Sequence, residues 1–452
     1  MKTQVSFREE DYDRFVRLLD EPSQETVVIA FAGRHQSPDR LGVLITGGEA
    51  VPSDAYLDRG PGTFRLRPAF VAERLLEAAS LGRTVVLIHS HPGWDYPPDF
   101  SPIDEDLHAR LVPSALRQIE GPFVSLVRSP GGWNGRIWKS PGDERVIERF
   151  RIVGRRLQVQ EVPARAQPAE ATYDRQLRAF GPAMQRTLAS LRVAIVGLGG
   201  TGSLTAQWLA HVGVRDFVLV DPDVIEASNL SRLVGGRPDD VASGMRKVDI
   251  AQRTIRSVAP EAQVASYALD VLACDAARAV SSADIILNCT DSHASRALVN
   301  RIAYQYLVPL IDMATLLRAE DGAVSGAYAD VRLAGPTRSC LRCQGVIDAD
   351  RVREEMAPPA ERAGLIRAGY LSGVSVPEPS VLPLNALAVS LALLRLFDTV
   401  EPWLEWPGRV TFEARRLQVI EQDRASQSNC EICTGDQVLG WGDDRSLPCR
   451  DG

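Results

Sequence analysis

The sequence lacks several features that would point away from a cytoplasmic globular protein. It has no apolar run approaching the ~20 residues that a membrane-spanning helix needs, so we expect no membrane partner. Its first ten residues, MKTQVSFREE, lack the apolar core of a signal peptide. It also lacks an excess of positive charge: the formal net charge is -7, which gives no reason to expect nucleic acid as a partner. These absences predict a cytoplasmic location.

The chain is long enough for two or three domains. Its 452 residues are 45% hydrophobic and 24% charged, which is ordinary for a globular protein. The patterning weakens after residue 140, and residues 162–171 (VPARAQPAEA) are rich in proline and alanine. We therefore predict a first domain over residues 1–140, a linker over 141–172 and a second domain over 173–452.

Apolar patterning predicts an α/β fold for both domains. In the first, a mixed α/β arrangement is expected, with strands at 26–32, 41–46 and 84–91, a helix at 68–81 and a hairpin at 122–139. In the second, strands at 192–196, 216–220 and 283–289 alternate with helices that end at 212 and 257, and a late apolar helix covers 384–397. This alternation predicts a Rossmann-like, mostly parallel sheet.

The first domain carries the motif His89-Ser90-His91-Pro92, followed by Ser101-Pro102-Ile103-Asp104. Residues two apart on a strand leave the same face, so both imidazoles point to one site, with Asp104 in the first turn of the next helix. Two imidazoles and a carboxylate leave one position for water, the ligand count of a catalytic zinc site. Two alternatives involve no metal: the H-x-H pair could be structural, and Ser101 and Asp104 could form a helix capping box.

This pair of motifs resembles the JAB/MPN (JAMM) zinc metalloprotease family, whose members cleave ubiquitin, ubiquitin-like tails or isopeptide bonds. The resemblance implies that His89, His91 and Asp104 hold the catalytic Zn²⁺, and that Ser101 supplies a hydroxyl near the oxyanion. It also implies an acid–base glutamate on or just before an early strand. Glu25 fits that position best, and Glu49 is the second choice.

The second domain opens its first helix with a glycine loop, Gly197-Leu198-Gly199-Gly200-Thr201-Gly202. Such glycines let the backbone approach phosphates at a helix N-terminus, where the helix dipole favours anions. Asp221 follows ~20 residues later, at the position that holds ribose hydroxyls. On these residues alone, an NAD-dependent dehydrogenase remains open.

Further motifs resemble the ubiquitin-activating and ThiF-like adenylyltransferase family, over about residues 173–433. They are Asp221-Pro222-Asp223, Ser228-Asn229-Leu230-Ser231-Arg232, Lys247 and Thr290-Asp291. The resemblance implies that Asn229 and Arg232 meet ATP, Lys247 neutralises phosphate charge and Asp291 holds Mg²⁺. It also implies a homodimer in which Arg175 reaches the partner protomer's nucleotide. Taken singly, Arg232 and Lys247 could instead be surface charges.

Seven cysteines in a cytosolic chain favour metal binding or reactivity over disulfides. Two C-x-x-C pairs, Cys340 with Cys343 and Cys430 with Cys433, give the four thiolates of a structural zinc site; a redox pair is the alternative. No cysteine lies between residues 344 and 383, where many ubiquitin-activating enzymes form a thioester. Cys274, Cys289 and Cys449 are interpreted as buried or incidental thiols, with Cys449 in a loose tail.

The combined prediction is a bifunctional enzyme of a bacterial-type ubiquitin-like pathway. One half would trim or remove the modifier by zinc hydrolysis, and the other would adenylate its C-terminal glycine for transfer to a conjugating enzyme's cysteine. A second interpretation is processing and activation of a sulfur-carrier protein for cofactor or cysteine synthesis. A third is a scaffold in which one or both sites are inactive.

Overall fold

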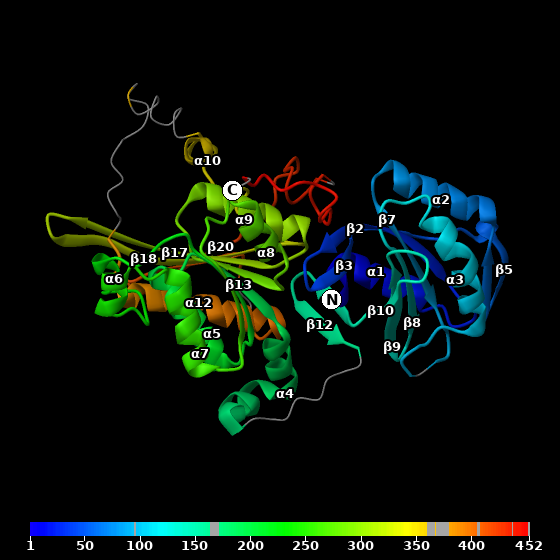
Figure 1. The fold of residues 1–452 in the computed structure, drawn as a ribbon, viewed down its shortest axis with the longest axis horizontal. Helices are drawn as coiled ribbons and strands as arrows, with labels where there is room; N and C mark the ends of the chain where they lie inside the picture. Colours follow the sequence, from blue (N-terminus) through cyan, green and yellow to red (C-terminus); the bar gives the residue numbers. More distant parts are fainter. Residues whose placement is uncertain are drawn as a thin grey trace. The chain divides into compact units, whose positions relative to one another are not determined.

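The computed structural model describes residues 1–94, 96–162, 171–358, 367, 379–404, 407–435 and 437–450. The chain folds into two compact units (Figure 1). Unit 1 comprises Met1–Ala166 together with Gln305–Leu307 and Gln437–Ser446, and unit 2 comprises the remainder. The chain therefore enters unit 1 three times.

These units correct the predicted domain boundaries. Unit 1 does not end at residue 140, because three further strands up to Glu161 belong to it. The predicted second domain, 173–452, also loses Gln437–Ser446 to unit 1. Part of the predicted linker, residues 163–170, lies outside the described residues.

Unit 1 is built on a sheet whose ten described strands run in the order β10-β9-β8-β7-β2-β3-β1-β11-β12, with β4 paired to β2. The pairs β1·β3, β1·β11 and β7·β8 are parallel and the others are antiparallel, so the predicted mixed α/β fold is confirmed. A separate hairpin joins β5 and β6. The elements are β1 (Lys2–Arg8), α1 (Glu9–Leu19), β2 (Val27–Gln36), β3 (Arg40–Ile45), β4 (Glu49–Ala50), β5 (Tyr56–Gly60), β6 (Thr63–Leu66), α2 (Pro68–Ser80), β7 (Thr84–Ser90), α3 (Pro102–Ala115), β8 (Phe123–Ser129), β9 (Gly132–Trp138), β10 (Glu144–Val146), β11 (Arg149–Val153) and β12 (Leu157–Glu161).

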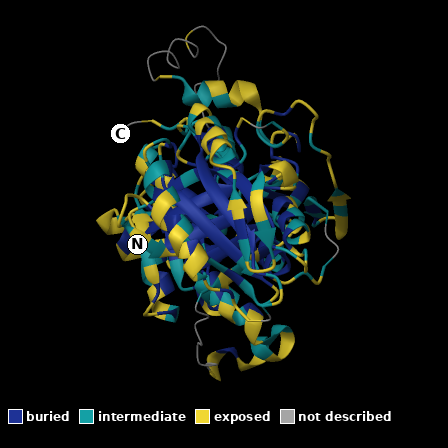
Figure 2. Ribbon diagram, turned by 90° about the vertical axis from the view of Figure 1, so that its right-hand side faces the viewer, coloured by how far each residue is buried: buried dark blue, intermediate teal, exposed yellow. Residues whose placement is uncertain are grey.

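Helices cover both faces of this sheet. Phe15 and Leu19 of α1 belong to the apolar cluster on one face. Leu75 of α2 and Val112 of α3 belong to the cluster on the other face. Figure 2 shows central strands that are buried, flanked by helices whose outer faces are exposed. The strand β7 lies inside the sheet, so the residues at its end are held on a rigid support.

Unit 2 is a Rossmann-like sheet extended by antiparallel strands. Its order is β15-β14-β13-β16-β17-β18-β19-β20, parallel from β15 to β17 and antiparallel beyond. In Figure 1, α5, α7 and α12 cover one face and α8 and α9 the other. The elements are α4 (Asp174–Ser190), β13 (Arg192–Val196), α5 (Gly200–Val212), β14 (Asp216–Val220), α6 (Pro238–Ser243), α7 (Lys247–Val258), β15 (Gln263–Tyr267), α8 (Cys274–Ser281), β16 (Ile285–Asn288), α9 (His293–Gln305), β17 (Leu310–Glu320), β18 (Ala323–Ala334), α10 (Ala349–Met356), α12 (Leu382–Val400), β19 (Arg409–Glu413) and β20 (Gln418–Gln422).

The helix α12 is long and apolar enough to cross a membrane by length and composition alone. The sequence-based expectation that no run approaches this length was therefore too strict. In the structure, 67% of its most apolar window is buried inside the protein. Ala388 packs against strand residues such as Ala329, as in a core helix.

Candidate functional site

The two histidines of the H-x-H motif converge in unit 1. His89 is at the end of β7 and His91 follows it, and their Nε2 atoms lie 3.3 Å apart. Asp104 lies in the first turn of α3. Its Oδ1 is 3.2 Å from His89 Nε2, and its Oδ2 is 3.2 Å from His91 Nε2. All three side chains are almost completely buried. The Nδ1 atoms have no hydrogen-bond partner among the described residues, so neighbouring rings, including Phe64 and Trp94, orient the imidazoles.

Ser101 and Asp104 form the helix capping box that was the alternative to metal binding in the sequence analysis. Ser101 Oγ accepts from the Asp104 amide at 3.3 Å, and Asp104 Oδ2 accepts from the Ser101 amide at 2.7 Å. Ser101 Oγ also donates to Asp104 Oδ2 at 2.8 Å. The box leaves the other oxygen, Oδ1, facing His89. Capping and ligand placement are therefore compatible, because the cap fixes the carboxylate that faces the imidazoles.

Glu25 lies next to the histidines, two residues before β2 begins at Val27. Its Oε1 is 3.9 Å from His91 Nε2 and the residue is 3% exposed. Burial raises the pKa of the Glu25 carboxyl to about 7. Glu49, the second choice for this role, is exposed on β4 and lines a separate shallow hollow with Arg8 and Thr46.

Sequence reasoning missed the residues that hold Glu25 in place. Arg59 of the β5–β6 hairpin donates through Nε to the Glu25 carbonyl at 2.6 Å and through Nη2 to Thr26 Oγ1 at 2.6 Å. Ser90, the middle residue of the H-x-H motif, accepts from the Thr26 amide at 2.9 Å. No local pattern marks Arg59, because its contact depends on a hairpin 34 residues away.

The donor set of this cluster suits a divalent transition metal. Two imidazole nitrogens and a carboxylate oxygen, all within 4.8 Å of one another, are the ligand types and number of a catalytic zinc site. Burial opposes ionisation of Asp104, but the hydrogen bonds to His89 and His91 outweigh it and lower the pKa of its carboxyl. Burial also lowers the pKa of His89. The lowered pKa values of Asp104 and His89 favour the ionised carboxylate and the neutral imidazole that a metal ion requires of its ligands.

In unit 2, the glycine loop lies between β13 and α5 and lines a cavity of about 1580 Å³. Gly197, Gly199 and Gly200 face this cavity. Gly202 does not: a Cβ there would lie 1.9 Å from the Gly197 carbonyl oxygen, so this glycine permits the loop to pack on its own helix. Its predicted nucleotide contact stays a prediction, and the structure shows its packing role in the loop.

The charged residues predicted for the nucleotide line the same cavity. They are Asp221, Arg232, Lys247 and Asp291. Asp221 accepts from the Leu198 amide at 2.6 Å, so it also fixes the glycine loop, and burial raises the pKa of its carboxyl. Lys247 Nζ lies 2.7 Å from Asp223 Oδ2.

Two predicted residues do not line this cavity. Asn229 accepts from the Glu226 amide at 3.1 Å and closes a short 3₁₀ turn that carries Arg232 nearby. Arg175 is exposed on α4. The structure therefore gives Asn229 a local structural contact and leaves Arg175 outside its own nucleotide site.

The cavity also contains residues that the sequence did not indicate. The buried Asn385 of α12 lies against Gly200, since a Cβ on Gly200 would be 2.2 Å from Asn385 Nδ2. Asn385 Oδ1 accepts from Thr315 Oγ1 at 3.1 Å. At the cavity wall, Arg296 binds the Asp291 carbonyl at 2.9 Å and the fully buried Asp312 at 3.2 Å. These contacts join distant elements, so no sequence spacing marks them.

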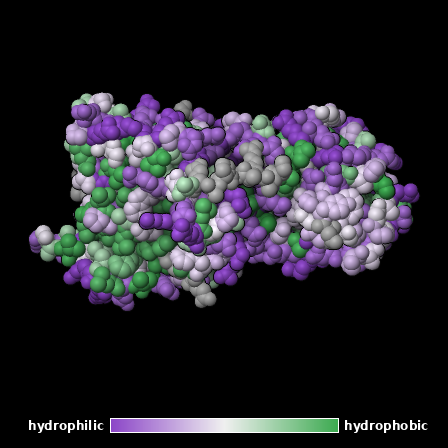
Figure 3. Space-filling model, turned by 90° about the horizontal axis from the view of Figure 1, so that it is seen from below, coloured by the Kyte–Doolittle hydropathy of each residue, from purple (hydrophilic) through white to green (hydrophobic). Residues whose placement is uncertain are grey.

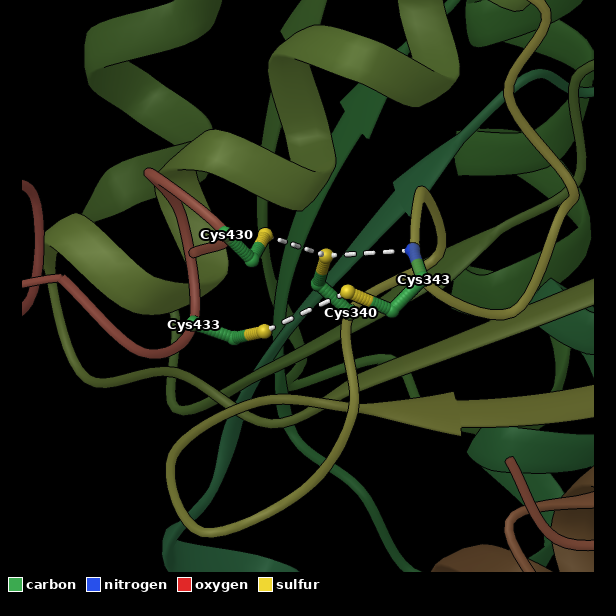
Figure 4. Close-up of side chains that lie close together, drawn as sticks. All are labelled: Cys340, Cys343, Cys430 and Cys433. Carbon is green, nitrogen blue, oxygen red and sulfur yellow. Dashed lines mark hydrogen bonds between the residues drawn. The ribbon is translucent and has the colours of Figure 1, made fainter. Parts of the chain in front are cut away.

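The two C-x-x-C pairs meet in unit 2. Figure 4 shows the four side chains turned toward one another. Cys340 Sγ lies 3.6 Å from Cys430 Sγ, and Cys343 Sγ lies 3.7 Å from Cys433 Sγ. Sulfurs ~2.3 Å from a central tetrahedral Zn²⁺ stand ~3.8 Å apart, so these two separations suit this ion. The cluster could therefore hold a structural zinc.

The other cysteines correct the sequence-based interpretation. Cys274 and Cys449 form a disulfide, so neither is an incidental thiol and Cys449 does not lie in a loose tail. The expectation that the cysteines avoid disulfides was wrong for this pair. Burial raises the pKa of the remaining thiol, Cys289, to about 12, so it is not a thiolate at neutral pH.

A Rossmann-like sheet with a glycine loop and a cavity at its carboxyl edge defines a nucleotide-binding α/β domain. The model of the ThiF family matches residues 173–402, which is half of the chain. The chain belongs to the ThiF family, and unit 2 contains its adenylyltransferase domain. This excludes the NAD-dependent dehydrogenase that the glycine loop alone left open.

Several characterised proteins are similar to this region. The molybdopterin-synthase adenylyltransferase of Escherichia coli is 34% identical over 58% of this chain and 95% of its own length. The SAMP-activating enzyme E1 of Haloferax volcanii is 32% identical over 36% of this chain and 56% of its own. The sulfur carrier protein ThiS adenylyltransferase of Bacillus subtilis is 30% identical, over 36% and 46%. The chain thus spans about half the length of the latter two relatives. A crystal structure of E. coli MccB aligns with a TM-score of 0.47 at 21% identity, over 60% of this chain and 76% of that one.

Proposed function

We propose that unit 2 activates the C-terminal carboxylate of a small carrier protein by ATP-dependent adenylation. The main supporting observation is that the glycine loop, Lys247 and Asp291 line one cavity. Its volume of about 1580 Å³ exceeds the ~300–1,000 Å³ of an ordinary small-ligand pocket, which leaves room for a peptide end beside a nucleotide.

In the proposed reaction, a carboxylate oxygen of the carrier attacks the α-phosphorus of ATP. The bond between this phosphorus and the bridging oxygen breaks, which gives an acyl-adenylate and pyrophosphate. The N-terminus of α5 attracts the phosphates, and Lys247 and Arg232 would offset their charge. Asp291 would hold Mg²⁺ through a carboxylate oxygen, the ligand type that this ion prefers. The protein contributes positioning and charge neutralisation.

The proposed substrate is a sulfur-carrier or ubiquitin-like protein that ends in glycine. The similarity to the ThiS adenylyltransferase and to the molybdopterin-synthase adenylyltransferase favours a sulfur carrier. No cysteine lies between residues 344 and 383, and Cys274 and Cys449 are bonded to each other. Cys289 lines the cavity, but the raised pKa of its thiol keeps it protonated and weakly nucleophilic. The activated acyl group would therefore pass to sulfur on another protein. A conjugating enzyme's cysteine is the alternative acceptor.

We further propose that unit 2 forms a homodimer. Arg175 is exposed and outside its own cavity, as expected of a residue that reaches a partner's nucleotide. Figure 3 shows apolar side chains gathered on the face of unit 2 seen from below. Val381 and Leu382 at the start of α12, and Trp403 after its end, are separately 36–50% exposed. Exposed apolar patches of this kind mark subunit interfaces.

ATP–pyrophosphate exchange tests the adenylation, with a ThiS-type carrier ending in glycine as the probe. Asp291→Ala should abolish exchange because it removes the proposed Mg²⁺ ligand. Asp275→Ala is the matched control, since Asp275 is an exposed carboxylate on α8 outside the cavity. Normal exchange by the Asp291 variant would contradict this assignment.

We propose a second function for unit 1, metal-dependent hydrolysis of an amide bond at the carrier's C-terminus. The convergence of His89, His91 and Asp104 beside the buried Glu25 supports it. The three residues would hold Zn²⁺, which would lower the pKa of a bound water towards neutral pH. Glu25 would take the proton from the attacking water and return it to the leaving amine. The activity would expose a terminal glycine or release the carrier from a target.

Cleavage of a carrier with a short peptide after its terminal glycine tests this second function. Glu25→Gln should abolish cleavage and leave exchange unchanged, whereas Glu49→Gln should leave both unchanged. Full cleavage by the Glu25 variant would move the base elsewhere. A wild-type chain that binds no zinc and shows neither cleavage nor exchange would instead indicate a scaffold.

A further inference from the structure

The C-terminal residues 447–450 return to unit 2 and lie beside the nucleotide cavity. The Arg450 amide donates to the Leu272 carbonyl at 2.7 Å, and the Cys274 amide donates to the Arg450 carbonyl at 3.0 Å. The Cys274–Cys449 disulfide closes this contact covalently. Asp270 and Val271, which precede Leu272 in the chain, line the cavity. The disulfide therefore lies near the rim of the cavity.

The same segment also holds a second wall of the cavity. Arg450 Nη2 donates to the Glu355 carbonyl at 3.1 Å and lies 3.4 Å from Met356 Sδ. Glu355 is at the end of α10 and lines the cavity. Residues 447–450 therefore connect the start of α8 to the end of α10, and we call them the C-terminal strap.

Glu355 links the C-terminal strap to the proposed Mg²⁺ site. Its carboxylate accepts from Ser292 Oγ at 2.6 Å, from the His293 amide at 3.2 Å and from the Ala294 amide at 2.7 Å. It thereby caps α9, whose N-terminal residues directly follow Asp291. A shift of Glu355 would remove the cap of α9 next to Asp291 and leave its first amides without their acceptor.

We propose that Arg450 is a positioning residue of the nucleotide site and that the Cys274–Cys449 disulfide is its redox-sensitive lock. This inference rests on the adenylation function proposed for unit 2. With the disulfide intact, the strap holds Glu355 and hence the α9 N-terminus. Without it, the strap is held, among the described residues, by the backbone hydrogen bonds of Arg450 and by its guanidinium contact with Glu355.

The redox step is thiol–disulfide exchange with a dithiol reductant. A thiolate of the reductant attacks one sulfur of the Cys274–Cys449 bond and forms a mixed disulfide. The other protein sulfur leaves as a thiol in that step. The reductant's second thiol then attacks the mixed disulfide and displaces the protein sulfur held in it, which gives the second protein thiol and an oxidised reductant. Two electrons and two protons pass from the dithiol to the protein. A reducing cytoplasm would therefore open the lock, and oxidising conditions would close it.

Binding of a fluorescent ATP analogue with Mg²⁺ to the full chain tests the proposal. Reduction with a dithiol should raise the Kd by about five-fold or more, the size of a modest coupling between two sites. Cys449→Ser should bind like the reduced wild type and should not respond to the dithiol. Because this variant retains the four-cysteine cluster, a dithiol response that persists in it would come from the cluster and would overturn the proposal.

Arg450→Ala should weaken binding even with the disulfide formed, and Arg450→Lys should restore part of the loss because a lysine can still donate to the Glu355 carbonyl. Arg178→Ala, at an exposed arginine of α4, is the control and should bind normally. Equal Kd values for oxidised, reduced and Cys449→Ser protein would overturn the lock. Failure to bind in every redox state would instead refute the proposed adenylation function, and the inference would fall with it.

Discussion

Arg34 and Asp444 are 410 positions apart in the chain and form an ion pair inside unit 1. Asp444 also accepts from the Arg34 amide at 3.1 Å, and its side chain is only 2% exposed. The neighbouring Asp443 accepts from the Tyr306 hydroxyl at 2.8 Å. Unit 1 therefore depends on residues from three distant parts of the chain.

Asp444→Ala should destabilise unit 1 by about 1–3 kcal/mol, because it leaves the Arg34 amide and guanidinium without their acceptor. Asp444→Asn should cost less. Burial already raises the pKa of Asp444, so the site disfavours the charge, and asparagine keeps an acceptor oxygen. Thermal unfolding measures both.

The control is Asp106→Ala, which removes a largely exposed ion pair with Arg110 and should change the stability little. Equal losses of stability for Asp444→Ala and Asp106→Ala would contradict the assignment.

Gly442→Ala should also destabilise unit 1, for a steric reason. Its φ is +54°, and a Cβ would lie 1.9 Å from the Arg34 carbonyl oxygen. Gly82→Ala is a matched control, because Gly82 has φ +63° but no atom within 4 Å of the added Cβ. The control should lose only the ~1–2 kcal/mol of left-handed strain. The excess loss at position 442, measured by denaturant unfolding, reports the close packing of the C-terminal segment; no excess would mean that the segment can move away.

Local sequence patterns were sufficient to predict most of the helices and strands around the sites. The strand predicted at 192–196 and the helix that ends at 212 are β13 and α5, and the hairpin predicted at 122–139 is β8 and β9. These segments have strong periodicity or clear glycine signals, so their structure is specified within a few residues. The motif residues His89, His91 and Asp104 converge as their spacing implied.

Contacts between distant segments could not be predicted from local sequence patterns. The disulfide joins residues 175 apart, and nothing near Cys449 marks Cys274 as its partner. The insertion of Gln437–Ser446 into unit 1 was missed because a short polar segment has no periodicity of its own. Arg59 and Asn385 owe their positions to tertiary packing, which neither residue's neighbours encode.

The glycine loop allows binding and folding to be separated within one motif. Gly202→Ala places a Cβ 1.9 Å from the Gly197 carbonyl oxygen, so it should lower the unfolding temperature of unit 2 and weaken ATP binding together. A Cβ at Gly199 meets no atom within 4 Å, so Gly199→Ala should keep the wild-type unfolding temperature. It should still weaken nucleotide binding, because it obstructs the backbone's approach to phosphate. Calorimetry and ATP titration of both variants distinguish the roles, and an unstable Gly199 variant would refute the separation.

Zinc stoichiometry tests both proposed metal sites at once. The full chain should bind two zinc ions, one at the His89–His91–Asp104 cluster and one at the four cysteines. His89→Ala with His91→Ala should leave one ion and spare the stability of unit 2. Cys340→Ser with Cys343→Ser should also leave one ion but unfold the C-terminal part of unit 2, because structural zinc binding contributes directly to folding free energy. Cys289→Ser, at a thiol outside the cluster, should keep both ions. Metal analysis of each purified variant measures these numbers, and two ions in the histidine variant would show that unit 1 binds no zinc at this cluster.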